Sequence, residues 1–236
     1  MINRTTLLNS ASALALLAGA SFHIQPVAAM TIGFDDLTDA SGGFGGTPIA
    51  SGYNGLTWTN WNVLNTADFT TNFGPSGATP GTVSAPNIAY NPDGGEAIFS
   101  SPLASPFTLN TADLTAFYND NLQVTVTGKL GGVTKDTETI TLSATAATLE
   151  TFSFADINEV DLLVTASGTH HSGYSGAGTQ VAMDNLTITP VAVPAPLIGR
   201  GLPVVLAVGG VLLGAKLTER SKKRRSPGSA IPHAAG

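Results

Sequence analysis

The sequence contains no cysteine, and only 11% of its 236 residues are charged. The absence of thiols excludes disulfides, thiol catalysis and cysteine-ligated metals, so a folded domain must depend on an apolar core. Cations are scarce in the long central part, where residues 30–193 hold fifteen carboxylates and two lysines, a net charge of −13. Such a segment repels phosphate backbones, which excludes nucleic acid as its partner.

The two ends of the chain differ from this acidic centre. Residues 194–236 carry seven cations and one carboxylate, and Arg4 is the only charged residue before Asp35. An asymmetry of this kind predicts segments with different roles rather than one uniform globule.

Residues 1–29 have the composition of a secretory signal peptide. Arg4 precedes an apolar stretch from Leu7 to about Ala20, and the small residues Val27-Ala28-Ala29 close the segment. A basic start, an apolar middle and small residues at the cleavage site are typical of exported proteins. We therefore expect cleavage after Ala29 and a mature protein outside the cytoplasm.

The C-terminal part predicts a membrane anchor with one transmembrane helix. An uncharged run from Gly201 to Ala215 precedes six cations between Lys216 and Arg225. Fifteen helical residues reach about 22 Å, and flanking apolar residues and snorkelling cations extend them toward a hydrocarbon core of about 30 Å. Because clustered cations stay in the cytoplasm, the acidic segment is expected outside the inner membrane.

A short motif precedes this anchor. Val193-Pro194-Ala195-Pro196, the apolar run and the basic cluster follow one another within residues 193–225. This order resembles the PEP-CTERM sorting signal of exported bacterial proteins, with Ala195 in place of the usual glutamate. The resemblance implies an exosortase-like processing enzyme and a final location at the cell surface or in an exopolysaccharide matrix. An ordinary anchor would share the topology but keep its helix. Residues 226–236 are expected to be a disordered tail.

Residues 30–192 are expected to form one all-β domain. Leu122–Leu130 and Thr137–Leu142 alternate apolar with polar residues, and Gly131-Gly132 between them predicts a hairpin turn. About eleven short strands without a helix of normal length predict an antiparallel β-sandwich, with jelly-roll topology. The other strands are expected at residues 31–34, 55–61, 87–90, 97–100, 107–109, 114–118, 149–154, 160–165 and 180–189. The glycine-rich segments 41–46 and 72–81 are expected to be surface loops, which commonly form binding surfaces.

Four segments resemble secreted β-sandwich domains similar to carbohydrate-binding modules. They are Phe34-Asp35-Asp36-Leu37, residues 53–58, residues 114–120 and Ala182-Met183-Asp184-Asn185-Leu186. The resemblance implies that the first and last strands are neighbours and that polar loops gather at the rim.

That neighbourhood would bring Asp35 or Asp36 close to Asp184 or Asn185. Calcium prefers oxygen ligands of this kind, so a structural calcium ion is a candidate at these four residues. The alternative is that they make the turn and cap hydrogen bonds that Asp and Asn often make.

Two aromatic clusters are candidates for carbohydrate binding. Alternation along residues 55–61 places Trp58 in the core and Trp61 on the opposite face, where an indole can stack on a sugar ring. The polar side chains available beside Trp61 are Asn60, Asn62 and Asp68. The second cluster consists of Tyr118, Asn119 and Asp120. The alternative is that each aromatic side chain covers a sheet and binds nothing.

The sequence carries no recognised catalytic signature. It has no HExxH, no phosphate-binding loop and no complete Gly-x-Ser-x-Gly. His170 and His171 are adjacent and would point to opposite faces of a strand, so they are expected to be solvated loop residues. Carboxylates are so numerous that a pair at glycosidase spacing is expected by chance.

These observations predict a non-enzymatic protein of the cell envelope that is exported, membrane-anchored and associated with extracellular polysaccharide. Two alternatives stay open at this point. One is a purely structural or protein-interaction sandwich without a sugar site. The other is a polysaccharide-cleaving enzyme.

Overall fold

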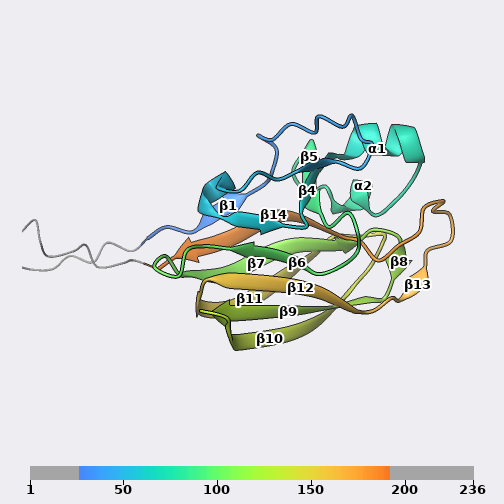
Figure 1. The fold of residues 1–236 in the computed structure, drawn as a ribbon. Helices are drawn as coiled ribbons and strands as arrows, with labels where there is room; N and C mark the ends of the chain where they lie inside the picture. The colour runs from blue at the N-terminus through green and yellow to red at the C-terminus, as the bar shows by residue number, and fades with distance from the viewer. Residues whose placement is uncertain (1–26, 192–236) are drawn as a thin grey trace, which may run out of the picture. The chain divides into compact units, whose positions relative to one another are not determined.

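The computed structural model describes residues 27–191 of the chain. The predicted signal peptide, the sorting motif Val193-Pro194-Ala195-Pro196 and the predicted anchor lie outside these residues, apart from Val27-Ala28-Ala29. The described residues form two antiparallel sheets packed face to face (Figure 1), so the predicted β-sandwich is confirmed.

One sheet has seven strands, and β1 (Met30–Ile32) is paired with its third strand, β14. The order of the other strands is β11 (Thr148–Ile157), β7 (Phe107–Ala116), β14 (Val181–Pro190), β5 (Asn87–Tyr90), β4 (Asn62–Asn65) and β2 (Thr47–Pro48). The pairing of β1 with β14 confirms that the first and last strands are neighbours, with Ile32 opposite Leu186.

The second sheet has five strands. Their order is β10 (Val133–Leu142), β9 (Leu122–Leu130), β12 (Glu159–Ala166), β6 (Ala97–Ser100) and β3 (Thr57–Thr59). The predicted hairpin between β9 and β10 is confirmed, because Gly131 and Gly132 have φ of 58° and 78° and Val133 pairs with Leu130. Glycine adopts such angles at no steric cost because it has no β-carbon. A separate two-stranded ribbon joins β8 (Asn119–Asp120) to β13 (Thr169–His170).

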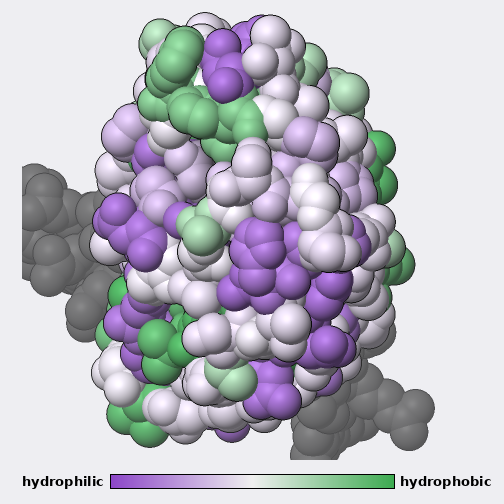
Figure 2. All heavy atoms as spheres, turned by 90° about the vertical axis from the view of Figure 1, so that its right-hand side faces the viewer, coloured by the Kyte–Doolittle hydropathy of each residue, from purple (hydrophilic) through white to green (hydrophobic). Residues whose placement is uncertain are grey.

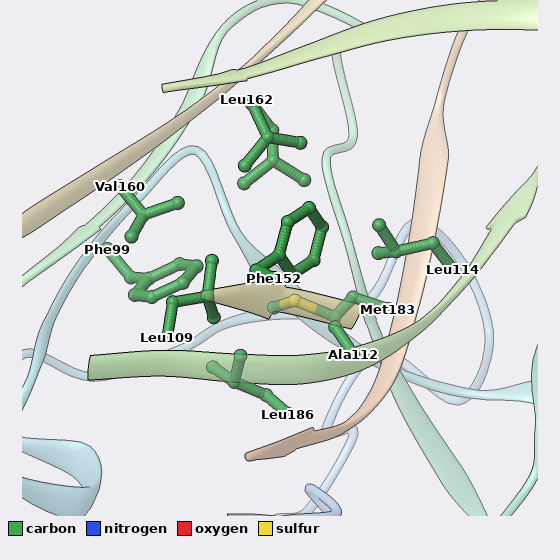
Figure 3. Close-up of a pocket in the computed structure, with 10 residues that line it drawn as sticks. Phe99, Leu109, Ala112, Leu114, Phe152, Val160, Leu162, Met183 and Leu186 are labelled. Atoms are coloured by element: carbon green, nitrogen blue, oxygen red, sulfur yellow. The ribbon is translucent and has the colours of Figure 1, made fainter. Parts of the chain in front are cut away.

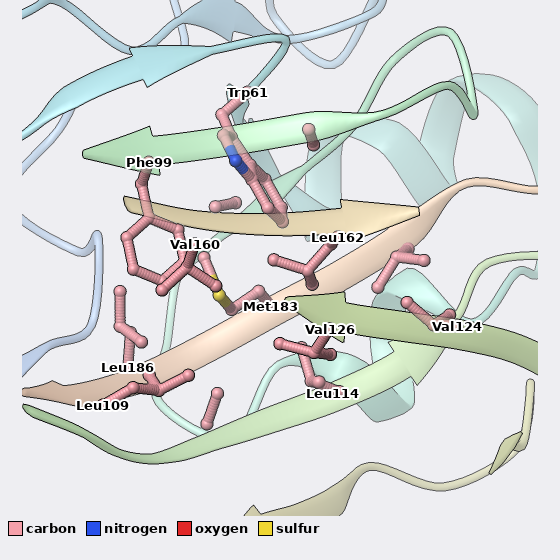
Figure 4. Close-up of a cluster of buried hydrophobic side chains, with 14 of the residues drawn as sticks. Trp61, Phe99, Leu109, Leu114, Val124, Val126, Val160, Leu162, Met183 and Leu186 are labelled. Carbon is pink, nitrogen blue, oxygen red and sulfur yellow. The ribbon is translucent and has the colours of Figure 1, made fainter. Parts of the chain in front are cut away.

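The core lies between the two sheets (Figure 4), where alternating positions of facing strands meet. Val124 and Val126 of β9 and Val160 and Leu162 of β12 are at most 4% exposed. Opposite them are apolar side chains of β7 and β14, among them Leu109, Leu114, Met183 and Leu186. The alternation of apolar and polar residues that predicted these strands therefore places their apolar side chains in the core.

Three short helical segments lie among the strands, and only part of them falls where a loop was predicted. A 3₁₀ turn covers Tyr53–Gly55, α1 spans Thr66–Phe73 and α2 spans Ala78–Gly81. The prediction of a loop at 72–81 was partly wrong, because packing of Gly77 and Gly81 against β7 stabilises a helix that local sequence does not favour. A second small core under α1 and α2 contains Leu64, Phe69, Ala78, Ile88, Tyr90, Phe117 and Ala182.

The two ends of the sandwich differ (Figure 1). The "chain-terminus end" is where β1 begins and β14 ends, and it includes residues 27–30, 101–106, 129–134, 156–159 and 190–191. The "loop end" lies opposite and includes residues 39–46, 70–77, 118–121, 143–147 and 167–180. No helix within residues 27–191 has the length and apolar character that a membrane crossing requires.

Candidate functional site

Trp61 is a core residue, so its predicted role as a sugar platform is wrong. Its side chain is 2% exposed, and its ring meets Trp58 edge-on with centroids 6.5 Å apart. The prediction assumed one strand over residues 55–61, but β3 ends at Thr59 and Asn60 has a φ of 56°. This left-handed residue breaks the alternation where the chain passes from one sheet to the other, so Trp61 points between the sheets (Figure 4).

The polar residues predicted to surround Trp61 instead hold separate parts of the fold. Asn60 Nδ2 donates to the Glu96 carbonyl at 2.9 Å, and Asn62 Nδ2 donates to the Gly45 carbonyl at 2.9 Å. Asp68 lies in the first turn of α1, where its backbone N–H is capped by the side chain of Asn65. The structure therefore does not gather Asn60, Asn62 and Asp68 around one ligand.

Tyr118, Asn119 and Asp120 stay together at the loop end. Asn119 Nδ2 donates to the Ser167 carbonyl at 2.7 Å, and the Tyr118 carbonyl accepts from the N–H of His171. The half-buried Tyr118 ring lies so close to Gly176 that a β-carbon there would sit 2.3 Å from it. Burial raises the pKa of the Tyr118 phenol. These three residues form the base on which the segment 167–178 lies.

An Asp120–His171 pair fastens this segment. His171 Nδ1 lies 2.6 Å from Asp120 Oδ2, and the other carboxylate oxygen accepts from the N–H of Ala144 at 3.0 Å. The hydrogen bond from His171, together with that from Ala144, holds the pKa of Asp120 below its usual value. Asp120 thus joins three segments that are distant in sequence.

Two more hydrogen bonds stabilise the segment 167–178, one within the segment and one to the loop that contains Ala144. His170 Nε2 lies 2.7 Å from the Gly176 carbonyl, and the Tyr174 hydroxyl donates to the Ala144 carbonyl at 2.8 Å. The expectation that His170 and His171 are solvated loop residues is confirmed for the exposure of His170, which lies in β13, and is wrong for His171, which is partly buried against Asp120. Both imidazoles organise the loop, and 28% of the His171 side chain is exposed.

An exposed aromatic pair lies beside this segment. Phe44 is 68% exposed and Phe73 is 46% exposed, and their rings meet edge to face with centroids 5.5 Å apart. A hydrophobic patch is visible at the top of the loop end (Figure 2), in the region of α1. Phe73 also contacts the buried Phe69, with centroids 5.0 Å apart, so the pair extends outward from the small core under α1.

Asp39 fixes the glycine-rich loop that carries Phe44. Its carboxylate accepts from the backbone of Ser41 at 2.9 Å, Gly43 at 3.1 Å and Asn65 at 3.1 Å, and from the Ser41 hydroxyl. Burial acts to raise the pKa of Asp39, but these hydrogen bonds outweigh it and lower the pKa. These hydrogen bonds fix the conformation of the loop, and so they fix the position of Phe44.

Three segments meet around the aromatic pair. Asn72 Nδ2 donates to the Gly42 carbonyl at 2.8 Å, which joins α1 to the glycine-rich loop. The Ser175 hydroxyl donates to the Phe73 carbonyl at 3.1 Å, which joins α1 to the segment that Asp120 fastens. These segments form a rim that consists of the exposed rings of Phe44 and Phe73, the Asn72 side chain and the Ser175 hydroxyl.

The residues predicted to hold calcium are only partly brought together. Asp35 Oδ2 and Asn185 Oδ1 lie 3.4 Å and 3.6 Å from the position of a β-carbon at Gly33. Asp36 instead accepts from the Tyr53 hydroxyl at 2.6 Å. Within residues 27–191 there is no group of three or more Asp, Glu or His side chains placed to hold a metal.

Asp184 uses its oxygens for hydrogen bonds. Its fully buried carboxylate accepts from the N–H groups of Val83, Ser84 and Asn185 at 2.7–2.8 Å and from the Ser84 hydroxyl at 3.0 Å. Burial raises the pKa of Asp184, against the effect of these four donors. This is the turn-and-cap role that the sequence left open as the alternative to calcium, and it leaves Asp184 without an oxygen for an ion.

The cavity between the two sheets is too small to bind a ligand. A cavity of about 10 Å³ lies between the sheets (Figure 3) and is lined entirely by apolar side chains, Phe99, Leu162 and Met183 among them. A space of this size holds at most about one water molecule. The loop end is therefore the candidate functional surface.

No family model and no curated protein matches this chain. The sequence resemblances to a sorting signal and to carbohydrate-binding modules consequently stay hypotheses, and the geometry of the loop end is the observation that bears on function.

Proposed function

We propose that this protein is an exported, envelope-anchored surface or matrix protein whose β-sandwich, of jelly-roll type, associates with extracellular polysaccharide at the loop end. One observation carries the proposal: Phe44 and Phe73, at 68% and 46% exposure, form an aromatic pair on a rim that hydrogen bonds hold in place. The module is proposed to bind rather than to catalyse.

The chemistry of this rim suits a sugar ring. A pyranose has an apolar face that packs on an aromatic ring, while its hydroxyl groups need donors and acceptors at the edge. Asp68 and Asn72 lie on α1 with Phe73, and Ser175 bonds to the Phe73 backbone. Two rings about 5.5 Å apart give an apolar surface of sugar size with polar groups around it.

The charge of the domain favours a neutral polysaccharide. Lys129 and Lys135 are the only cations among residues 30–193, and they lie on β9 and β10 rather than on the rim. A surface without cations cannot pair with the carboxylates or sulfates of an acidic polysaccharide. An anionic chain would therefore bind only through a bridging cation such as calcium.

The location in the envelope is proposed from the two ends of the sequence. Residues 1–29 have the features of a signal peptide, and residues 193–225 resemble a sorting signal that an exosortase-like enzyme would process.

The cluster Tyr118, Asn119 and Asp120 has a supporting role in the proposed sugar site, because it positions the segment that contacts Phe73.

Affinity electrophoresis tests this function. The protein is run through gels that contain a β-1,3-glucan, a galactomannan, a xylan or alginate. We expect at least one neutral polysaccharide to retard it, and Phe44→Ala and Phe73→Ala each to weaken that binding about tenfold, since an aromatic contact contributes about 0.5–1.5 kcal/mol beyond its buried area.

Leu149→Ala is the matched control, because Leu149 is 61% exposed on β11 and away from the rim. It should bind as the wild type does. Retardation that survives both phenylalanine substitutions would remove the aromatic pair from the site. Retardation by no polysaccharide would favour a structural or protein-interaction sandwich, and release of reducing sugar would favour an enzyme.

A further inference from the structure

Hydrogen bonds join several segments at the chain-terminus end. The N–H of Val191 donates to the Pro106 carbonyl, and that of Ser101 donates to the Asn158 carbonyl, both at 2.8 Å. Asn158 also accepts at its side-chain oxygen from the N–H of Gly131 at 2.8 Å. The last strand, the β6–β7 loop and the β9–β10 turn therefore form one unit at this end.

Aliphatic side chains are exposed on this unit. Val133 is 66% exposed and Leu103 is 60% exposed, and a β-carbon at Gly131 would lie 3.6 Å from Leu103. Val27 and Val191, at 39% and 38%, flank the points where the described chain begins and ends. By contrast, the exposed apolar side chains of the loop end are the aromatic pair Phe44 and Phe73.

The only cations of residues 30–193 belong to the same unit. Lys135 follows Val133 by two residues on β10. Lys129, the penultimate residue of β9, pairs with Asp161 and lies 3.2 Å from Glu159. Lys135 is exposed, so an aliphatic tip lies beside a long-stemmed lysine, a combination found where proteins meet the polar boundary of a bilayer, whereas the charge of Lys129 is paired within the domain.

The length of chain beyond Val191 limits which end can meet a membrane. Nine residues separate Val191 from the apolar run that begins at Gly201, which extended span about 33 Å at most. The ten-residue strands of the sandwich are themselves about 33 Å long. The connecting chain would have to run fully extended along the whole domain to bring the loop end to the membrane.

We propose that the chain-terminus end rests on the phospholipid surface, with Leu103 and Val133 in the interface and the loop end directed away from it. This inference depends on the anchor at residues 201–215, which is part of the proposed function. It gives the anchored protein one orientation, in which the aromatic pair faces the extracellular matrix.

The absence of cysteine allows a direct test. Single cysteines are introduced in the full chain as Leu103→Cys, Val133→Cys, Phe44→Cys and Leu149→Cys, and each is labelled with an environment-sensitive fluorophore. The proteins are reconstituted into phosphatidylcholine vesicles that carry a lipid-attached nitroxide quencher. Uncharged lipid is chosen because anionic lipid would repel the acidic domain.

We expect about twofold quenching at positions 103 and 133, because an interfacial side chain enters the bilayer boundary by 5–10 Å, and unchanged emission at 44 and 149. Leu149 is the matched control, since it is as exposed as Leu103. Equal emission at all four positions in protein that floats with vesicles overturns the orientation and leaves glycan binding untouched. Full chain that does not float with vesicles overturns both the orientation and the anchor, while electrophoresis still tests the sugar site.

Discussion

The two ends of this sandwich are built differently. At the chain-terminus end a two-glycine turn and short connections close the strands, and the exposed apolar groups are single aliphatic side chains. At the loop end long segments, the helix α1 and a two-stranded ribbon extend from the sheets, and carboxylates such as Asp39 and Asp120 hold them. We propose from this contrast that one end serves attachment and the other recognition, because ordered loops on a rigid scaffold are where binding residues collect.

The largest expected effect comes from the core that both ends share. Trp61→Ala should lower the free energy of unfolding by about 3–5 kcal/mol, because it leaves a cavity where the chain crosses between the sheets. Urea denaturation measures this loss. Phe44→Ala is the control and should change stability by less than about 0.5 kcal/mol, as expected for an exposed position. A Trp61→Ala protein of wild-type stability would show that the indole is not part of the core.

Asp184→Ala should have the next largest effect, about 2–3 kcal/mol. The substitution removes a fully buried carboxylate that accepts from the N–H groups of Val83 and Ser84 and from the Ser84 hydroxyl. The comparison variant is Asp36→Ala, whose exposed carboxylate has only the Tyr53 hydroxyl as a donor. Thermal melts that show equal losses for the two variants would contradict the role assigned to Asp184.

A smaller effect, confined to one end, is expected from Asp120. Because its pKa is lower in the folded than in the unfolded protein, its contribution to stability is complete above about pH 4 and is lost as the pH falls through the folded pKa. Acidification should therefore lower the protection factors, which compare exchange with that of an unstructured peptide at the same pH, in residues 167–178, and Asp120→Asn should do so at pH 7. The protection factors of residues 129–134 should not change. Equal changes at both ends would show that the Asp120–His171 pair is not local.

Removal of calcium is expected to have the smallest effect. Because N–H and O–H donors already occupy both oxygens of Asp184, a chelator should move the thermal midpoint by no more than about 1 °C. Differential scanning calorimetry with and without EGTA makes the measurement. A drop of several degrees would place a structural ion near Asp35 and Asn185, between the two ends.

The strands were predictable because they follow a period of two. The predicted bounds of β5, β6 and β9 match the structure, and the turn at Gly131-Gly132 follows from the glycine pair. β7 was predicted as two strands because residues 110–113 are mostly polar, yet pairing with β11 on one side and β14 on the other keeps it continuous. The alternation of apolar and polar residues therefore predicts where strands occur, whereas pairing with neighbouring strands determines how long they are.

The candidate site was less predictable. Trp61 was misplaced because one left-handed residue, Asn60, reverses the alternation. Asparagine adopts that conformation more often than most residues, but most asparagines do not adopt it, so the residue type alone did not predict the reversal. The Asp120–His171 pair joins residues 51 apart in sequence, which no local pattern reveals. Phe44 did carry a signal, since a lone phenylalanine between two glycine pairs has no core periodicity to explain it.

Hydrogen exchange of the full chain, with and without a neutral polysaccharide that retards it, tests the division of roles most directly. The account predicts slower exchange in residues 42–46, 70–77 and 171–176 when the polysaccharide is bound. Exchange in residues 101–106 and 129–134 should stay the same. Protection at the chain-terminus end, or along the strands of either sheet with none at the loop end, would contradict it.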